Sequence, residues 1–242
     1  MPTPPKIVLT GAPGSGKSTI ARALEQRHPG QFIVVPEAAT QYYSGLGRKW
    51  NQLTLEQQRD AQRAIYRLQL AQEERLRAEN PGRVMLLDRG TIDGSAYWPD
   101  GPSAYWTDLG TTEDAQFGRY DHVIVLETAA VIGLYDGDAS NHVRFEGAAE
   151  AIENARKLAS LWAGHANVSL VRAEADLARK VDAVAAIVAT YLVPAPGTPG
   201  EGRDADDRSL AGPGPSGGVR RERDSPAIDS SRRCDSVGQK SE

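Results

Sequence analysis

One continuous stretch of the chain has the residue types and spacing needed to bind a polyphosphate. It follows the apolar run Ile7-Val8-Leu9 and fits the pattern G-x-x-x-x-G-K-[ST], with the residues Gly11, Ala12, Pro13, Gly14, Ser15, Gly16, Lys17, Ser18 and Thr19. Its glycines let backbone N–H groups turn toward phosphate oxygens, and a helix starting near Lys17 adds its positive N-terminal end. Lys17 is then expected at the β- and γ-phosphates and the Ser18 hydroxyl at Mg²⁺. The alternative is a chance glycine-rich turn, which the preceding strand and the following helix argue against.

An acid–arginine pair follows a second apolar run. Asp88 closes the run Val84-Met85-Leu86-Leu87, and Arg89 comes directly after it. An aspartate at this position commonly holds Mg²⁺ in phosphate-loop enzymes, and the alternative is that it caps the helix expected next. The planar guanidinium of Arg89 suits contacts with phosphate oxygens, and the alternative is a salt bridge with a neighbouring acid.

Three further residues are candidates for a role in phosphoryl transfer. Glu37 follows the strand expected at 31–35, where its carboxylate could act as a base or bind a hydroxyl acceptor. Asp93 competes with Glu37 for this role, and a surface carboxylate is the alternative for both. Arg144 lies in the segment 135–146, which could form a lid, and its charge could stabilise the transferring phosphoryl group. A surface ion pair is the alternative for Arg144.

Aromatic residues gather in two segments that follow strand ends. Their rings could stack on a planar ligand, or they could pack these segments onto the protein, and the sequence favours neither reading. These residues are Tyr42, Tyr43 and Trp50 in the first segment and Tyr97, Trp98, Tyr105 and Trp106 in the second.

Strands alternate with helices along the chain, which predicts a parallel sheet covered by helices on both faces. The expected strands are 6–9, 31–35, 84–88, 122–126 and 168–171, and the expected helices are 16–27, 54–79, 147–164 and 176–192, with short helices near 91–98 and 111–117 and a loop or broken helix over 38–53. Ligands bind at the carboxyl ends of the strands in such sheets. We therefore expect Glu37, Asp88-Arg89 and Glu127-Thr128 at one edge with the phosphate loop.

Composition limits the remaining possibilities. The 242 residues carry a net charge of −4, which argues against a nucleic-acid binder. The lone cysteine, Cys234, fits a reducing cytoplasm, and no apolar run reaches the ~20 residues of a membrane span. Residues 194–242 are rich in Gly, Pro, Ser, Arg and Asp, so we expect a disordered C-terminal tail after a single domain over 1–193.

Several residue groups together resemble the NadR-like P-loop ATPase/kinase family, which includes ribosylnicotinamide kinase domains and AAA-type ATP/GTP-binding proteins. The matching groups are the phosphate loop, Pro36-Glu37-Ala38-Ala39, Asp88-Arg89-Gly90-Thr91-Ile92-Asp93-Gly94 with Ala96-Tyr97-Trp98, and Tyr120-Asp121-His122-Val123. The resemblance implies a nucleoside-kinase-like P-loop NTPase fold with strand order 2-3-1-4-5, and ATP or GTP with Mg²⁺. The expected lid has one arginine, Arg144, where kinase lids often have several. No adenylyltransferase domain is expected before the loop.

Two hypotheses about function follow. The first is a small-molecule kinase that moves the γ-phosphate of ATP to a nucleoside-like hydroxyl, using Lys17, Glu37, Asp88, Arg89 and Arg144. The second is a nucleotide-binding regulator or slow NTPase without an acceptor. The guanine-reading motif N-K-x-D is absent from the sequence, which counts against a Ras-like switch.

Overall fold

The protein contains a five-stranded parallel sheet in the order β2-β3-β1-β4-β5. The computed structural model describes residues 3–48, 50–135 and 147–192. The strands are β1 (Lys6–Thr10), β2 (Phe32–Val35), β3 (Val84–Asp88), β4 (His122–Leu126) and β5 (Val168–Val171). β1 occupies the centre, with Leu9 beside Asp88 on one side and Ile124 on the other. The expected P-loop NTPase fold and its strand order are confirmed.

The helices differ from the expected ones mainly in two segments. They are α1 (Lys17–Arg27), α2 (Ala38–Leu46), α3 (Leu55–Glu79), α4 (Pro102–Leu109), α5 (Glu113–Phe117), α6 (Ala148–Trp162) and α7 (Leu177–Val188), with the 3₁₀ turns η1 (Trp50–Gln52), η2 (Thr91–Tyr97), η3 (Ala129–Ile132) and η4 (Ala189–Tyr191). α4 was not expected, and the loop or broken helix over 38–53 consists of α2 and η1. The tail predicted at 194–242 lies outside the described residues.

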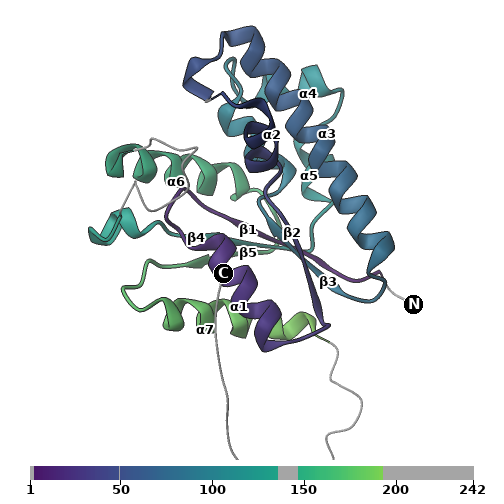
Figure 1. Cartoon of the computed structure of the whole chain (residues 1–242), viewed down its shortest axis with the longest axis vertical. Coiled ribbons are helices and arrows are strands. Elements are labelled where there is room, and N and C mark those ends of the chain that lie inside the picture. The colour runs from purple at the N-terminus through teal and green to yellow at the C-terminus, as the bar shows by residue number, and fades with distance from the viewer. Residues whose placement is uncertain (1–2, 49, 136–146, 193–242) are drawn as a thin grey trace, which may run out of the picture. The chain divides into compact units, whose positions relative to one another are not determined.

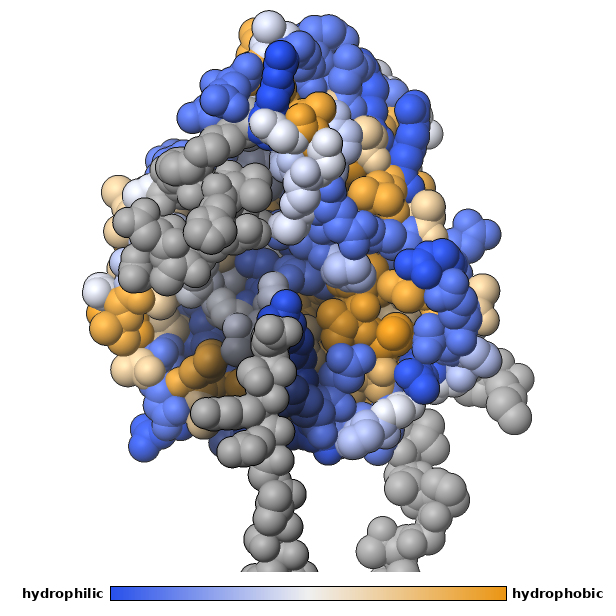
Figure 2. All heavy atoms as spheres, in the orientation of Figure 1, coloured by the Kyte–Doolittle hydropathy of each residue, from blue (hydrophilic) through white to orange (hydrophobic). Residues whose placement is uncertain are grey.

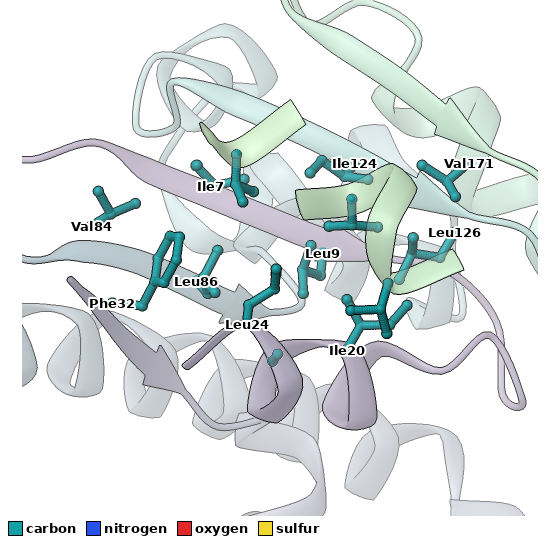
Figure 3. Packing of buried hydrophobic residues seen from close by; sticks show 14 residues of the cluster. Ile7, Leu9, Ile20, Leu24, Phe32, Val84, Leu86, Ile124, Leu126 and Val171 are labelled. Carbon is teal, nitrogen blue, oxygen red and sulfur yellow. The ribbon is translucent and has the colours of Figure 1, made fainter. Parts of the chain in front are cut away.

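Two hydrophobic clusters hold helices against the two faces of the sheet (Figure 1). Alternate residues of β1 point to opposite faces, so Ile7 and Leu9 belong to one cluster and Val8 to the other. Figure 3 shows the first cluster, in which α1 contributes Ile20 and Leu24. α7 completes this cluster, while η2, α4 and α6 supply the second. Because these helices cover the two faces of the sheet, the carboxyl ends of the strands remain available for the candidate site.

The long helix α3 begins at a capping box and carries buried polar residues. The Thr54 hydroxyl accepts from the Gln57 N–H, and the Gln57 side chain accepts from the Thr54 N–H. Near the other end, the buried carboxylate of Glu73 accepts from Lys6 at 2.6 Å and from Arg119 at 2.6 Å. The Tyr120 hydroxyl also donates to Glu73, and it accepts a hydrogen bond from the N–H of Thr91, the first residue of η2. This polar network fixes α3 to the segment that follows β3.

The described residues contain no helix that is long and apolar enough to cross a membrane. Hydrophilic residues predominate on the face in Figure 2, and hydrophobic residues form separate patches there. Scattered exposed apolar residues of this kind are normal on globular proteins.

Candidate functional site

The phosphate loop joins β1 to α1 and depends on glycines at three positions. Gly11, Gly14 and Gly16 have φ values of 144°, 72° and 87°, which favour glycine. A Cβ on Gly11 would overlap the carbonyl oxygen of Leu126, so the loop runs directly over the end of β4. A Cβ on Gly14 would lie 2.6 Å from the ring of Tyr135. The backbone geometry therefore excludes side chains at the points where the loop turns.

Lys17 folds back over this loop. Its Nζ donates to the carbonyl oxygen of Gly11 at 2.8 Å and lies 3.3 Å from both the carbonyl oxygen of Ala12 and the hydroxyl of Ser15. The side chain is buried. The ammonium group is thus held inside the curl of the loop, where a polyphosphate would meet it.

Ser18 and Asp88 meet across the gap between α1 and β3. The Ser18 Oγ donates to the Oδ2 of Asp88 at 2.5 Å. The other carboxylate oxygen, Oδ1, is buried and has no hydrogen-bond partner among the described residues. A hydroxyl beside a carboxylate with an unused oxygen is a donor set that suits Mg²⁺, which prefers oxygen ligands. The two residues therefore fit the cation that phosphate-loop proteins bind with their nucleotide.

Arg89 connects the ends of β2 and β3. Its Nε donates to the Oε1 of Glu37 at 2.6 Å, and its NH1 donates to the Oδ1 of Asp93 at 3.1 Å. Its φ of 76° is unusual for a residue other than glycine, and such backbone conformations concentrate at functional sites. Burial by itself lowers the pKa of Arg89. Tyr97, Glu37 and the neighbouring aspartates raise the pKa by more than burial lowers it, so the net pKa is well above its usual value. The guanidinium therefore stays charged.

The carboxylate of Asp93 is fully occupied by hydrogen bonds. Its Oδ1 accepts from the Thr10 hydroxyl and from Arg89. Its Oδ2 accepts from the Gly90 N–H at 3.1 Å and from the Trp162 indole N–H at 3.1 Å. Asp93 is also buried. This arrangement makes Asp93 a support for Arg89 and favours Glu37 as the carboxylate that could face a substrate.

The outer side of the phosphate loop is anchored by β4 and α7. Lys180 of α7 is buried, and its Nζ donates to the carbonyl oxygens of Ser15 at 2.8 Å and Glu127 at 2.6 Å. The Thr128 hydroxyl donates to the carbonyl oxygen of Pro13 at 2.7 Å. Desolvation lowers the pKa of Lys180 to about 8, although nearby carboxylates oppose the shift. These contacts fix the carbonyls of the loop away from its phosphate-binding side.

The carboxylate of Glu127 contacts the segment that follows β5. It accepts from the Ala173 N–H at 2.9 Å and lies 3.4 Å from Arg172, after the end of β5. Of the residues expected at this edge, Glu127 thus contributes its backbone and not its acid group. Arg144 lies outside the described residues.

A cavity of about 270 Å³ lies beside this edge, on the side of α2, α3 and η2. Glu37, Arg89 and Asp93, which follow the ends of β2 and β3, are among the polar residues that line it. The rest of its lining includes the aromatic residues Tyr43, Trp50, Tyr66, Tyr97 and Tyr105.

The sequence left open whether the aromatic residues face a ligand or pack their segments onto the protein, and the structure shows that they divide between cavity lining and packing. Tyr43 and Trp50 are 6.5 Å apart between ring centroids, and Trp50 and Tyr97 are 6.4 Å apart, so these rings form a connected wall. Trp98 and Trp106 are instead buried in the second hydrophobic cluster. Part of the aromatic content lines the cavity, and part only packs the fold.

The sequence reasoning missed two polar residues, Gln62 and Lys180. Gln62 lines the cavity and follows Ala61 on the buried side of α3. Lys180 lies next to Val181 on the inward side of α7. A polar residue on the apolar side of an amphipathic helix was the available signal in both cases.

Comparison with known proteins agrees with this architecture. A family model described as an AAA domain matches residues 6–180, which include the phosphate loop, Glu37, Asp88 and Arg89. No curated protein matches the chain. The described residues contain no group of three or more His, Cys, Asp or Glu side chains that could hold a metal ion. The match spans most of the chain, which therefore belongs to the AAA domain family of P-loop nucleotide-binding proteins.

Proposed function

We propose that this protein is a small-molecule kinase of the NadR-like type, which transfers the γ-phosphate of ATP to a hydroxyl group of a nucleoside-like acceptor. The observation that carries the proposal is the cavity beside the phosphate loop, with Glu37 and Arg89 in its wall. A nucleotide hydrolase or regulator needs a phosphate loop, but it needs no additional pocket for an organic molecule. An acceptor in this cavity would lie against the edge where the loop holds the donor.

The donor half of the proposed site consists of three residues. Lys17 would neutralise charge on the β- and γ-phosphates, and Ser18 and Asp88 would hold Mg²⁺. Mg²⁺, when bound, would supply positive charge that offsets the negative charge of the phosphates. The support for this assignment is the 2.5 Å contact between Ser18 and Asp88 and the unused, buried Oδ1 of Asp88.

The acceptor half consists of Glu37 and Arg89. The acceptor oxygen forms a bond to the γ-phosphorus while the bond from that phosphorus to the β–γ bridging oxygen breaks, and ADP leaves with that oxygen. The proton of the acceptor hydroxyl passes to the carboxylate of Glu37, and the guanidinium of Arg89 balances negative charge on the transferring group. Glu37 fits the role of base better than Asp93, because four donors already occupy the carboxylate of Asp93.

A screen of nucleosides with γ-labelled ATP and Mg²⁺ tests the proposal. We expect label to appear in at least one nucleoside monophosphate, and we expect Lys17→Ala to abolish the transfer. Release of inorganic phosphate without any labelled acceptor would overturn the kinase proposal in favour of a slow NTPase or a nucleotide-dependent regulator. GTP in place of ATP, in a parallel series, would identify the preferred donor.

A further inference from the structure

One region of the cavity carries polar groups that make no hydrogen bond with any described residue. Gln62 lines the cavity with only 4% of its surface exposed, and its amide makes no hydrogen bond with any described residue. The hydroxyl of Tyr105, which is 1% exposed, likewise has no hydrogen bond among the residues that the structure describes. Both groups border Gly94, where an added Cβ would overlap the Tyr105 hydroxyl and lie 3.3 Å from the Oε1 of Gln62. The glycine therefore leaves room for both of these polar groups.

The other buried glutamines on α3 are used differently. The Nε2 of Gln69 donates to Glu73 at 3.0 Å and to the carbonyl oxygen of Arg89 at 3.4 Å. The Nε2 of Gln72 donates to the Oε1 of Gln41 at 2.5 Å, and the Oε1 of Gln72 is buried without a hydrogen bond to any described residue. Most buried polar side-chain atoms have at least one hydrogen-bond partner, in the protein or in ordered water. Gln62 differs because its amide borders the cavity, where a ligand could supply the missing bonds.

The walls of the cavity limit the shape of such a ligand. Tyr66 and Tyr105 lie 6.3 Å apart between centroids on one part of the wall, and Tyr43, Trp50 and Tyr97 form another. Aromatic walls favour a planar ring, on which they can stack. A volume of about 270 Å³ lies below the usual range of about 300–1,000 Å³ for ligand pockets, so the ligand should be compact.

We infer that Gln62 is a specificity-determining residue that reads the edge of a planar heterocycle in the acceptor. A carboxamide presents one donor and one acceptor side by side, and it pairs with a ring edge that has an adjacent acceptor and donor. The ligand class is therefore a nucleoside whose base carries such an edge, as adenosine, inosine, cytidine and uridine do. This inference rests on the proposed kinase function, because it places the acceptor in the same cavity.

Calorimetric binding of paired nucleosides tests the inference without any transfer reaction. The protein is saturated with ADP so that the phosphate loop is occupied. Adenosine and inosine are compared with purine riboside, and cytidine and uridine with the riboside of 2-pyrimidinone, because each analogue lacks a group at the reading edge. We expect at least one natural nucleoside to bind the wild-type protein about 10- to 150-fold more tightly than its analogue.

The variant Gln62→Met keeps the length of the side chain and removes its amide. We expect this variant to bind a nucleoside and its analogue about equally and to melt close to the wild type, because the amide of Gln62 makes no hydrogen bond with a described residue that the substitution would remove. Gln72→Met is the matched control, since Gln72 is a buried glutamine on the same helix outside the cavity. It should discriminate the pair as the wild type does.

Two results would overturn the role of Gln62. One is that no nucleoside of the panel binds, and the other is that Gln62→Met discriminates each pair as strongly as the wild type. The outcome is separable from that of the transfer assay. If labelled product forms and Gln62→Met still discriminates between a nucleoside and its analogue, the role of Gln62 is wrong and the kinase proposal stands. If nucleoside binding depends on Gln62 but no phosphoryl transfer occurs, the kinase proposal is wrong and the binding site stands.

Discussion

Arg89 holds Glu37 in place, with its Nε 2.6 Å from the Oε1 of that carboxylate. The second oxygen of Glu37 accepts from the Thr40 hydroxyl at 2.7 Å, in the first turn of α2. Residues from two strand ends and one helix thus set the position of a single carboxylate at the wall of the cavity. A carboxylate fixed in this way is pre-organised for a proton transfer at a defined position.

Replacing Glu37 by Gln should remove the base and keep the shape of the side chain. We expect kcat for phosphoryl transfer to fall by about 10²- to 10⁴-fold, while the affinity for ATP stays unchanged. Steady-state kinetics and calorimetry with ATP measure the two quantities. Glu74→Gln, an exposed position on α3, serves as the control and should behave as wild type. A kcat that is equal in both variants would reject Glu37 as the base.

Asp88→Asn should uncouple nucleotide binding from Mg²⁺. The substitution keeps the size of the side chain and removes the charge that would attract the cation. We expect the ratio of ATP affinity with Mg²⁺ to that with EDTA to fall at least tenfold, as for other changes around bound metals. Titration calorimetry under both conditions gives the ratio. Asp114→Asn, at an exposed position of α5, should leave it unchanged, and the prediction fails if Asp88→Asn does the same.

Lys17→Ala should reduce the affinity for ATP by at least about 100-fold, because charge-assisted hydrogen bonds to the phosphates are lost. Isothermal calorimetry checks this, and circular dichroism shows whether the variant is folded. Arg22→Ala is a suitable control, since Arg22 is an exposed cation on the same helix. An affinity that is unchanged in Lys17→Ala would refute nucleotide binding by this loop.

Lys180→Met should alter how stability depends on pH. The pKa of Lys180 is lowered from 10.5 to about 8 in the folded protein, so between these values the unfolded state binds more protons than the folded state. The free energy of unfolding of the wild type should therefore rise with pH across this window, by at most about 3 kcal/mol, relative to that of the variant. Below pH 8 both states are protonated, and the difference between the two proteins should be constant.

Urea denaturation of both proteins at pH 7, 8, 9 and 10 gives this difference directly. Other groups that titrate in this range cancel in the comparison, provided that they do not contact Lys180. The carboxylates of Glu127 and Glu174 act on Lys180 and raise its pKa, against the effect of burial. A difference that is flat from pH 8 to pH 10 would contradict the buried position of this ammonium.

Gly94→Ala should close the polar region of the cavity. Its Cβ would overlap the Tyr105 hydroxyl, and overpacking of this kind costs about 1–3 kcal/mol of stability. We expect a lower melting temperature and weaker binding of the acceptor, with the affinity for ATP retained. In Gly118→Ala the new Cβ would lie 3.6 Å from the carbonyl oxygen of Asp114, an ordinary contact, so this control should melt close to the wild type. Equal melting temperatures for the two variants would contradict the predicted overlap.

The sequence determined the sheet and the phosphate loop because both depend on local patterns. Short apolar runs identify buried parallel strands, and the spacing of glycines and Lys17 dictates the curl of the backbone. The meeting of Glu37 and Arg89 was also predictable, since the carboxyl ends of parallel strands share one edge. α4 was missed because its eight residues carry a weak periodic pattern, and the burial of Trp106 depends on packing against the second cluster.

Only the tertiary structure decided which polar groups are already engaged and which are unpaired. Four donors from three segments of the chain converge on Asp93, and Lys180 reaches the phosphate loop from 165 residues away in the chain. Whether Gln62 has a partner depends on the room left by Gly94 and on the position of Tyr105. Such contacts arise when distant elements pack together, and no local sequence pattern encodes them.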